Sequence, residues 1–242
     1  MNSLNGFLFI GLPYLTMALF LAGTIFRYRQ TGFRVSSLSS QFLEGQRLFW
    51  GSVPFHWGIL ALFVGHLWAF FLPEQMLLWN SHPVRLLALE VTGAAFGLSV
   101  LFGLVFLLVR RLGNPRVRMV TNRMDLTIEI LLIAQVILGC WTAIGYRWGS
   151  SWFAADLTPY LRSLFLLRPD ISAVVELPLI VKLHMIGAFL ITGLFPFTRL
   201  VHLLVAPFHY IWRPYQRVIW NWDRKTIRDP AGAWSRTRPR NN

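Results

Sequence analysis

The sequence predicts an all-α membrane protein, a bundle of five transmembrane helices. Hydrophobic residues make up 55 % of its 242 residues and charged residues only 14 %, whereas soluble domains carry about a quarter charged residues. A helix needs about 20 apolar residues to cross a hydrocarbon core of about 30 Å. Five stretches meet this requirement: Leu4–Phe26, Trp50–Leu72, Leu86–Val109, Leu126–Trp148 and Leu177–Leu204.

The first apolar run lacks a basic n-region and is long enough to span, so we expect a transmembrane helix rather than a cleaved signal peptide. Pro54 in the second run and Pro196 in the fifth are expected to kink their helices, since neighbouring helices can satisfy the freed backbone groups. The long connection before the fifth run contains Leu161, Leu164 and Phe165. It is expected to lie on the outer surface, either as a plain interfacial helix or as a lid over a site.

Basic residues are distributed unevenly over the loops and predict the orientation of the bundle. Seventeen Lys and Arg residues fall in the first loop, the third loop and the tail, against four in the second and fourth loops. Because basic residues are enriched in cytoplasmic segments, we expect the N-terminus outside and the C-terminus in the cytoplasm. Residues 1–205 then form the transmembrane domain and residues 206–242 a basic cytoplasmic tail.

The net charge of +13 lies mainly between the apolar runs and in the tail. We interpret it as a signal for topology and lipid headgroups, not for nucleic-acid binding. The single cysteine, Cys140, lies inside an apolar run, and the chain has no CxxC or CxxCH motif. Covalent c-type haem and Cys-ligated iron–sulfur clusters are therefore excluded on this chain.

Four of the six histidines lie inside predicted spans, where ionisable residues are rare and usually functional. His56 and His66 are on the second helix, and His184 and His202 are on the fifth. A hydrogen bond between helices would explain one such histidine, but two on each of two helices are harder to explain in this way. Antiparallel packing pairs His56 with His202 on the cytoplasmic side and His66 with His184 on the outer side. Each pair can clamp one planar cofactor, as two imidazoles do at the axial positions of a b-type haem.

The spacing of these histidines is less regular than the pairing requires. At 1.5 Å per residue, His56 and His66 are about 15 Å apart along their helix, and His184 and His202 about 27 Å. The latter two share a face, whereas the former differ by roughly 80° in azimuth. We expect tilted helices and tilted ring planes to absorb this mismatch.

Other residues of the two helices are candidates for contacts with flat rings. Arg199 lies three residues before His202, on nearly the same face, and is the candidate for a haem propionate. The alternative is that Arg199 snorkels to lipid headgroups. Large flat rings need a close approach of the helices, which glycines permit, although ordinary small-residue packing explains any single glycine equally well. The glycines are Gly58, Gly65, Gly187 and Gly193.

Several segments resemble the gamma subunit of respiratory nitrate reductase. The sequence FHWGILALFVGH (55–66) is similar to its second helix, and KLHMIGAFLITGLFPFTRLVH (182–202) is similar to its fifth. RRLGNPRVR (110–118) resembles its third loop, and SSLSSQFLEG (36–45) resembles the cytoplasmic segment after its first helix. The similarity runs over most of residues 1–215.

The resemblance implies a multi-pass dihaem cytochrome b of the bacterial cytoplasmic (inner) membrane, with no catalytic residues of its own. Quinol would be oxidised near the outer, distal haem, which His66 and His184 would bind. Electrons would pass to the inner, proximal haem on His56 and His202. They would then reach an iron–sulfur beta subunit and a molybdenum catalytic alpha subunit on the cytoplasmic side. The chain would thus be the electron-transfer subunit of a quinol-dependent nitrate reductase-type oxidoreductase.

The candidates for the quinol pocket are Arg85, His82 and Gly65. The family has a lysine near the start of its third helix, where this chain has Arg85. Arginine can donate a hydrogen bond to a quinone oxygen but hardly gives up a proton, so the pocket chemistry is expected to differ.

Three alternatives remain open at this stage. The same kind of subunit occurs in related complexes such as nitrite oxidoreductases, which run towards quinone. A haem-free anchor would use the four histidines for packing. A transporter would use them as a proton relay, but inverted repeats and broken helices would then be expected. The tail from Pro207 to Asn242 is rich in Trp, Tyr and Arg, and we expect it to dock on the iron–sulfur subunit.

Overall fold

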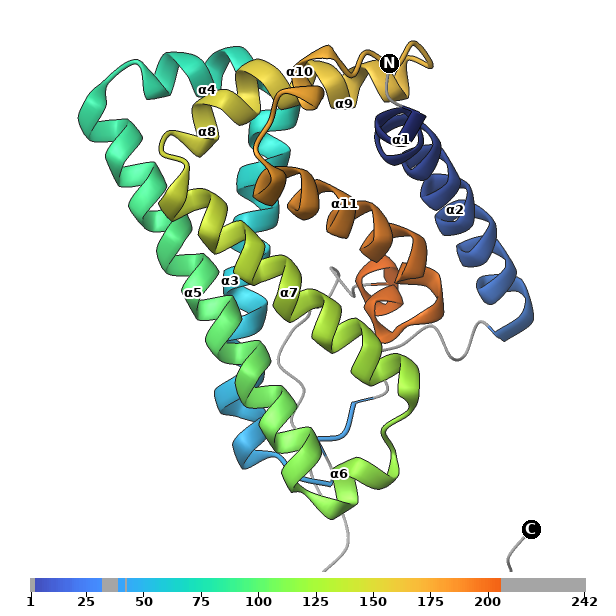
Figure 1. Ribbon diagram of the computed structural model, residues 1–242. Coiled ribbons are helices and arrows are strands. Elements are labelled where there is room, and N and C mark those ends of the chain that lie inside the picture. The colour runs from blue at the N-terminus through green and yellow to red at the C-terminus, as the bar shows by residue number, and fades with distance from the viewer. Residues whose placement is uncertain (1–2, 32–38, 42, 206–242) are drawn as a thin grey trace, which may run out of the picture. The chain divides into compact units, whose positions relative to one another are not determined.

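The computed structural model describes residues 3–31, 39–41 and 43–205, and the regular structure in these ranges is entirely helical. Five stretches within them are long and apolar enough to cross a membrane, which confirms the predicted fold class (Figure 1). They are Ser3–Gln30, Gln46–Phe71, Pro83–Gly113, Arg123–Gly145 and Leu179–Phe197. The orientation of the bundle and the domain division at residue 205 stay predictions. The tail from Pro207, with its expected docking role, lies outside the described residues.

The elements follow one another along the chain without long irregular loops between residues 43 and 205. The first span consists of α1 (Ser3–Gly6), the π-helical turn η1 (Phe7–Gly11) and α2 (Leu12–Thr31). Next come α3 (Gln46–Phe71), α4 (Pro73–Asn80), α5 (Pro83–Gly113), α6 (Pro115–Met119) and α7 (Arg123–Gly145). The connecting segment 149–176 contains α8 (Gly149–Trp152), η3 (Phe153–Leu157), α9 (Thr158–Phe165) and α10 (Ser172–Val175). The last elements are α11 (Leu179–Leu194), η4 (Phe195–Phe197) and η5 (Arg199–Val205).

The fifth span is broken, so the prediction of one helix over Leu177–Leu204 is wrong. Helix α11 ends at Leu194, because Pro196 has no N–H to donate to the preceding turn. Thr198 is then extended (φ −115°, ψ 179°), and its Oγ1 accepts a hydrogen bond of 3.2 Å from the Leu200 N–H as η5 begins. His202 lies on η5, so its separation from His184 does not follow the rise and azimuth of one helix.

The spans pack side by side in the order α3, α5, α7, α11, α2 (Figure 1). Glycine allows the closest of these approaches, since a Cβ on Gly103 of α5 would lie 2.7 Å from the Gly51 carbonyl oxygen of α3. Within the described residues, α3 and α11 are not among the helix pairs that pack extensively. The histidines of α3, His56 and His66, are accordingly exposed in the polypeptide.

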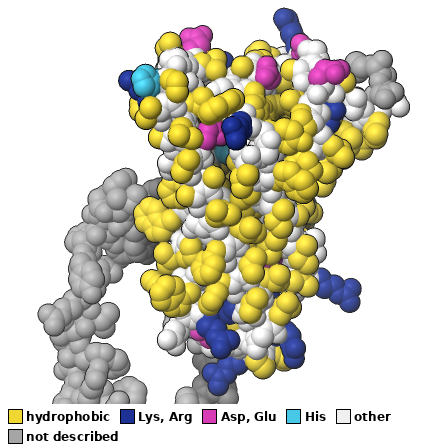
Figure 2. Space-filling view, turned by 60° about the vertical axis from the view of Figure 1, so that its left-hand side comes forward, with side chains coloured by type: hydrophobic (Ala, Val, Ile, Leu, Met, Phe, Trp, Pro, Cys, Tyr) yellow, Lys and Arg dark blue, Asp and Glu magenta, His cyan; other side chains and the backbone are white. Residues whose placement is uncertain are grey.

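The surface has the distribution of side chains that a membrane requires. Hydrophobic side chains cover the middle of the face in Figure 2, and charged side chains gather towards its two ends. Trp57, Phe63 and Trp68 on α3 are among the large apolar residues that are about half exposed or more, at 69 %, 48 % and 52 %. Such exposure is expected where lipid tails replace water as the solvent.

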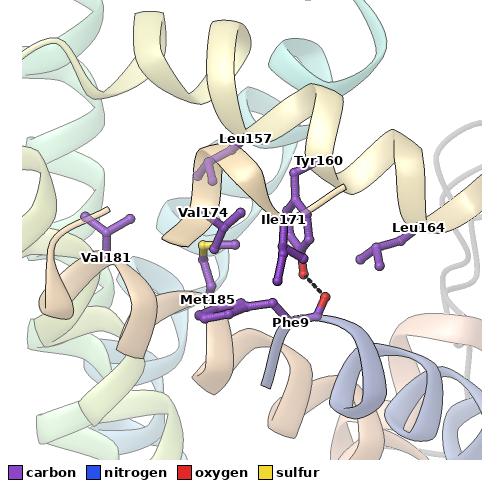
Figure 3. Close-up of a cluster of buried hydrophobic side chains, with 8 residues drawn as sticks. All are labelled: Phe9, Leu157, Tyr160, Leu164, Ile171, Val174, Val181 and Met185. Atoms are coloured by element: carbon purple, nitrogen blue, oxygen red, sulfur yellow. Dashed lines mark hydrogen bonds between the residues drawn. The ribbon is translucent and has the colours of Figure 1, made fainter. Parts of the chain in front are cut away.

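The connecting segment 149–176 contributes to the core at one end of the bundle (Figure 3). Tyr160 of α9 donates its hydroxyl hydrogen to the Phe9 carbonyl oxygen at 2.8 Å, and Tyr14 of α2 donates to the Leu164 carbonyl oxygen at 3.0 Å. The cluster consists of Phe9, Leu157, Tyr160, Leu164, Ile171, Val174, Val181 and Met185. The segment is therefore packed against the first and fifth spans, and is more than a helix resting on the surface.

Candidate functional site

The fold brings the rings of His56 of α3 and His202 of η5 close together. Their ring centroids are 6.3 Å apart and their planes differ by 62°. With a metal–imidazole bond of about 2 Å and about 1 Å from each nitrogen to its ring centre, two axial imidazoles have centroids about 6 Å apart. The break after Pro196 makes this approach possible, because it frees η5 from the direction of α11.

The second pair, His66 of α3 and His184 of α11, lies towards the connecting segment. Phe153 of η3 stands edge-on to the His66 ring, with centroids 5.4 Å apart and planes at 87°. The structure thus places His56 and His202 close together, whereas the pairing of His66 with His184 stays a prediction.

All four imidazoles donate Nδ1–H to a backbone carbonyl. A carbonyl oxygen can only accept a hydrogen bond, so Nδ1 holds the proton and Nε2 the lone pair in each ring. Within the described residues, no hydrogen bond engages any of the four Nε2 atoms. Histidines that bind metals are typically held in this way. The acceptors are Ser52 for His56 (2.7 Å), Leu62 for His66 (2.7 Å), Gln135 for His184 (3.0 Å) and Arg199 for His202 (2.6 Å).

These residues fit the requirements of haem better than those of a bare metal ion. The described residues contain no group of three or more His, Cys, Asp or Glu side chains that could hold an ion. A haem needs only two axial protein ligands because its ring supplies the other four donors. A ring between α3 and the fifth segment would also cover the exposed imidazoles of His56 and His66, which are costly to leave bare in hydrocarbon.

Arg199, the candidate for a haem propionate, is held by an acidic residue of α7. Its Nε and Nη2 donate to the two carboxylate oxygens of Asp125 at 2.6 and 2.7 Å, and Nη2 also donates to the Val120 carbonyl oxygen at 3.1 Å. Arg111 of α5 extends this network to Glu129 at 2.7 Å and to Asp125 at 3.8 Å. The network fixes Arg199 at the start of η5, three residues before His202. A contact between Arg199 and a haem propionate stays a prediction.

Most of the glycines named as possible ring contacts pack against other helices. A Cβ on Gly58 would meet Val100 of α5, one on Gly187 would meet Gln135 of α7, and one on Gly193 would meet Thr16 of α2. These three glycines therefore allow neighbouring helices to approach closely, and any contact of theirs with a flat ring stays a prediction. Gly65 differs, because no atom lies within 4 Å of its Cβ position, and it faces open space next to His66.

The other two candidates for a quinol pocket lie around the start of α5. His82 is the residue before Pro83 and precedes the helix in an extended conformation. The Arg85 guanidinium carbon lies 5.2 Å above the ring of Trp79 on α4. Both side chains are exposed. Their assignment to a pocket, together with Gly65, stays a prediction.

Sequence reasoning missed two residues of α7 that contact a histidine. Gln135 accepts the His184 Nδ1–H with its backbone carbonyl, and Gly139 lies next to the imidazole. Gln135 could have been noticed as an uncharged polar residue in an otherwise apolar run, but the sequence does not show which helix the Gln135 side chain faces.

Known proteins with similar sequences share one description. A family model described as nitrate reductase gamma subunit matches residues 5–221. The chain is 33 % identical to the nitrate reductase gamma chain of Bacillus subtilis (strain 168) over 209 residues, 84 % of this chain and 93 % of that one. It is 34 % identical to the respiratory nitrate reductase 1 gamma chain of Escherichia coli (strain K12) over 223 residues, 90 % and 98 % of the two chains.

A longer relative contains a matching region. The nitrate reductase-like protein NarX of Mycobacterium tuberculosis (strain ATCC 25618 / H37Rv) is 32 % identical over 211 residues, which cover 84 % of this chain and 32 % of that one. The family model and the two gamma chains each span most of the sequence, including the region from His56 to His202. The chain therefore belongs to the nitrate reductase gamma subunit family, and it is a membrane-anchoring subunit of a nitrate reductase-type oxidoreductase.

Proposed function

We propose that this subunit is a dihaem cytochrome b that oxidises quinol near the outer membrane face and delivers the electrons to a cytoplasmic iron–sulfur subunit. The observation that carries the proposal is the common state of the four histidines. Each has its Nδ1 proton fixed on a backbone carbonyl and its Nε2 lone pair free of hydrogen bonds in the described chain. An imidazole with its proton fixed on Nδ1 has Nε2 available as a metal ligand, the arrangement that is typical of metal-binding histidines.

We assign His56 and His202 to the proximal haem b, and His66 and His184 to the distal haem b. Held by two histidines each, the haems would supply one-electron transfer rather than oxygen chemistry. The protein contributes the fixed tautomers, the backbone acceptors that keep the ligands electron-rich, and a span that holds the two pairs at different depths in the membrane.

The proposed direction of electron movement across the membrane would conserve energy. We infer from the distribution of basic residues that the His66–His184 pair lies towards the outer face. Quinol oxidation there leaves protons outside while electrons move inward. Each charge moved across the membrane is worth about 2.3 kcal/mol per 100 mV, so energy is conserved without a proton pump.

In the proposed quinol pocket, the residues at the start of α5 hold the substrate near His66. Arg85, supported by the ring of Trp79, donates a hydrogen bond to a quinol oxygen. His82 takes the proton, because arginine does not give up its own. Gly65 leaves room beside His66 for the flat quinol ring.

The proposed partners are an iron–sulfur beta subunit and a molybdenum catalytic alpha subunit on the cytoplasmic side, besides membrane lipid. The basic tail, residues 206–242, is proposed to dock on the iron–sulfur subunit. In a related complex that works towards quinone, such as a nitrite oxidoreductase, the same pocket would serve in reverse.

The test is the reduction of the purified complex by a quinol, followed in the visible spectrum. We expect both haem signals to become reduced. Arg85→Ala should slow this reduction while leaving both haem spectra normal and leaving reduction by a soluble dye on the inner side unchanged. Arg168→Ala is the matched control, since Arg168 is an exposed arginine of the connecting segment.

Three outcomes would contradict the proposal. A complex whose spectrum does not respond to quinol is not a quinol-linked cytochrome. Normal quinol reduction in Arg85→Ala would remove Arg85 from the pocket. Collapse of the haem spectra in the same variant would show that Arg85 supports the structure instead of the substrate.

A further inference from the structure

Three of the four histidines are oriented by their own helical segment, and one is oriented by a different helix. His56 and His66 bond to carbonyls four residues earlier in α3, and His202 bonds to the carbonyl three residues earlier in η5. His184 instead donates its Nδ1–H to Gln135, which lies on α7. The ring of His184 therefore depends on the packing of α7 against α11.

Gln135 holds His184 at two points. Its backbone carbonyl accepts from the imidazole at 3.0 Å, and its side-chain Nε2 donates to the His184 carbonyl oxygen at 2.9 Å. The Gln135 side chain fits against α11 only because residue 187 is glycine, since a Cβ there would collide with Gln135 Oε1. The two bonds fix both the backbone and the ring of His184 relative to α7.

Gly139, one turn further along α7, lies next to the ring. A Cβ at this position would lie 2.9 Å from His184 Cε1, 3.5 Å from Nδ1 and 3.6 Å from Nε2. Even the smallest side chain would therefore require the imidazole or α7 to shift. Gly93 of α5 offers a contrast, because its Cβ position has nothing within 4 Å.

We propose that Gln135 and Gly139 of α7 are positioning residues that set the ring plane and the hydrogen bond of His184, and thereby the redox potential of the outer haem alone. This inference rests on the proposed function, since it requires a haem on His184. A hydrogen bond at Nδ1 makes the imidazole a more basic ligand, and a more basic ligand favours oxidised over reduced iron. Weakening the bond should therefore raise the midpoint potential of the outer haem and leave the inner haem unchanged.

The experiment compares Gly139→Ala, Gln135→Met and the control Gly93→Ala in the assembled complex. Gln135→Met removes the side-chain donor without adding bulk at the ring. We would measure haem content, the electron paramagnetic resonance signals of the two oxidised haems and both midpoint potentials by redox titration. The inner haem of the same molecule is an internal reference for general damage.

We expect Gly139→Ala to shift the resonance signal of the outer haem and to raise its potential, with a smaller shift of the same sign in Gln135→Met and none in Gly93→Ala. Loss of the outer haem alone from Gly139→Ala would also support the inference. Two haems with unchanged signals in both α7 variants, or equal changes at both haems, would overturn it. A wild-type complex without haem would instead refute the proposed function on which the inference rests.

Discussion

Replacing Asp125 by Asn tests whether α7 also holds the segment that carries His202. Asp125 accepts two hydrogen bonds from Arg199, and Arg199 in turn provides the carbonyl that accepts from His202. Asparagine keeps one oxygen that can accept the hydrogen bond from the Asn122 backbone N–H, which is part of the capping box at the start of α7. The substitution therefore removes the charge of the carboxylate and one acceptor oxygen while preserving the helix start.

The expected loss of stability follows from the burial of the pair. The Asp125 side chain is 3 % exposed and that of Arg199 is 22 % exposed. Removing one partner of a fully buried pair costs about 3–5 kcal/mol. Because Arg199 reaches some solvent and Asn keeps one acceptor, we expect about 2–3 kcal/mol here, roughly a 30- to 150-fold change in the unfolding equilibrium.

The assay is a double-mutant cycle of Asp125→Asn and Arg199→Gln, read by denaturant titration in mixed micelles and by haem content. If the two side chains act as a pair, the double variant should be little worse than the worse single variant, and both should lose the His56–His202 haem first. Strictly additive losses of stability would refute the pairing. If Arg199→Gln still removed haem from the Asp125→Asn background, Arg199 would also serve a propionate.

Three further perturbations test the packing around the site. Gly103→Ala should cost about 1–3 kcal/mol of unfolding free energy because the new Cβ meets the backbone of α3, whereas Gly93→Ala should be neutral. Burial opposes the charge of Glu44, but hydrogen bonds from the Arg47 N–H and Arg110 outweigh it and hold the pKa below its ordinary 4.5. The Glu44–Arg110 pair therefore stabilises the fold above pH 4.5, and this stabilisation is lost as the pH falls through the lower pKa that Glu44 has in the folded protein. The melting temperature should therefore fall more steeply in acid for wild type than for Glu44→Gln. Arg162→Met removes two hydrogen bonds to the last carbonyls of α3, of 2.9 and 3.1 Å. The substitution should make segment 149–176 more sensitive to limited proteolysis. An unchanged cleavage rate would show that these bonds do not hold the segment in place.

The sequence was sufficient for the five spans because their signal is local, whereas the role of the four histidines stays a prediction. Long apolar runs report spans whatever their neighbours, and a histidine within such a run is conspicuous. The two prolines show where local reasoning ends. Pro54 stays inside a helix, with the Ser99 hydroxyl donating to its carbonyl at 3.2 Å, whereas Pro196 ends one.

The break at Pro196 depends on a residue that is 169 positions away in the chain. The Arg27 guanidinium donates to the carbonyl oxygens of Pro196 and Thr198 at 2.5 and 2.9 Å. These two carbonyls therefore keep hydrogen-bond partners although the helix has ended. Gln135 is a similar case, since its polarity is visible in the sequence but its contact with His184 is a product of helix packing. Interactions of this kind could not be predicted without the fold.

The central claim is that four histidines hold two haems in two defined pairs. The most direct measurement is haem content by pyridine haemochrome, with low-temperature spectra, for the wild-type complex and four single alanine variants. We predict two haems per chain in wild type, and the same lost signal in His56→Ala and His202→Ala. The other signal should be lost in both His66→Ala and His184→Ala. A haem content near zero in intact wild-type complex, or a common lost signal in His56→Ala and His184→Ala, would contradict the account.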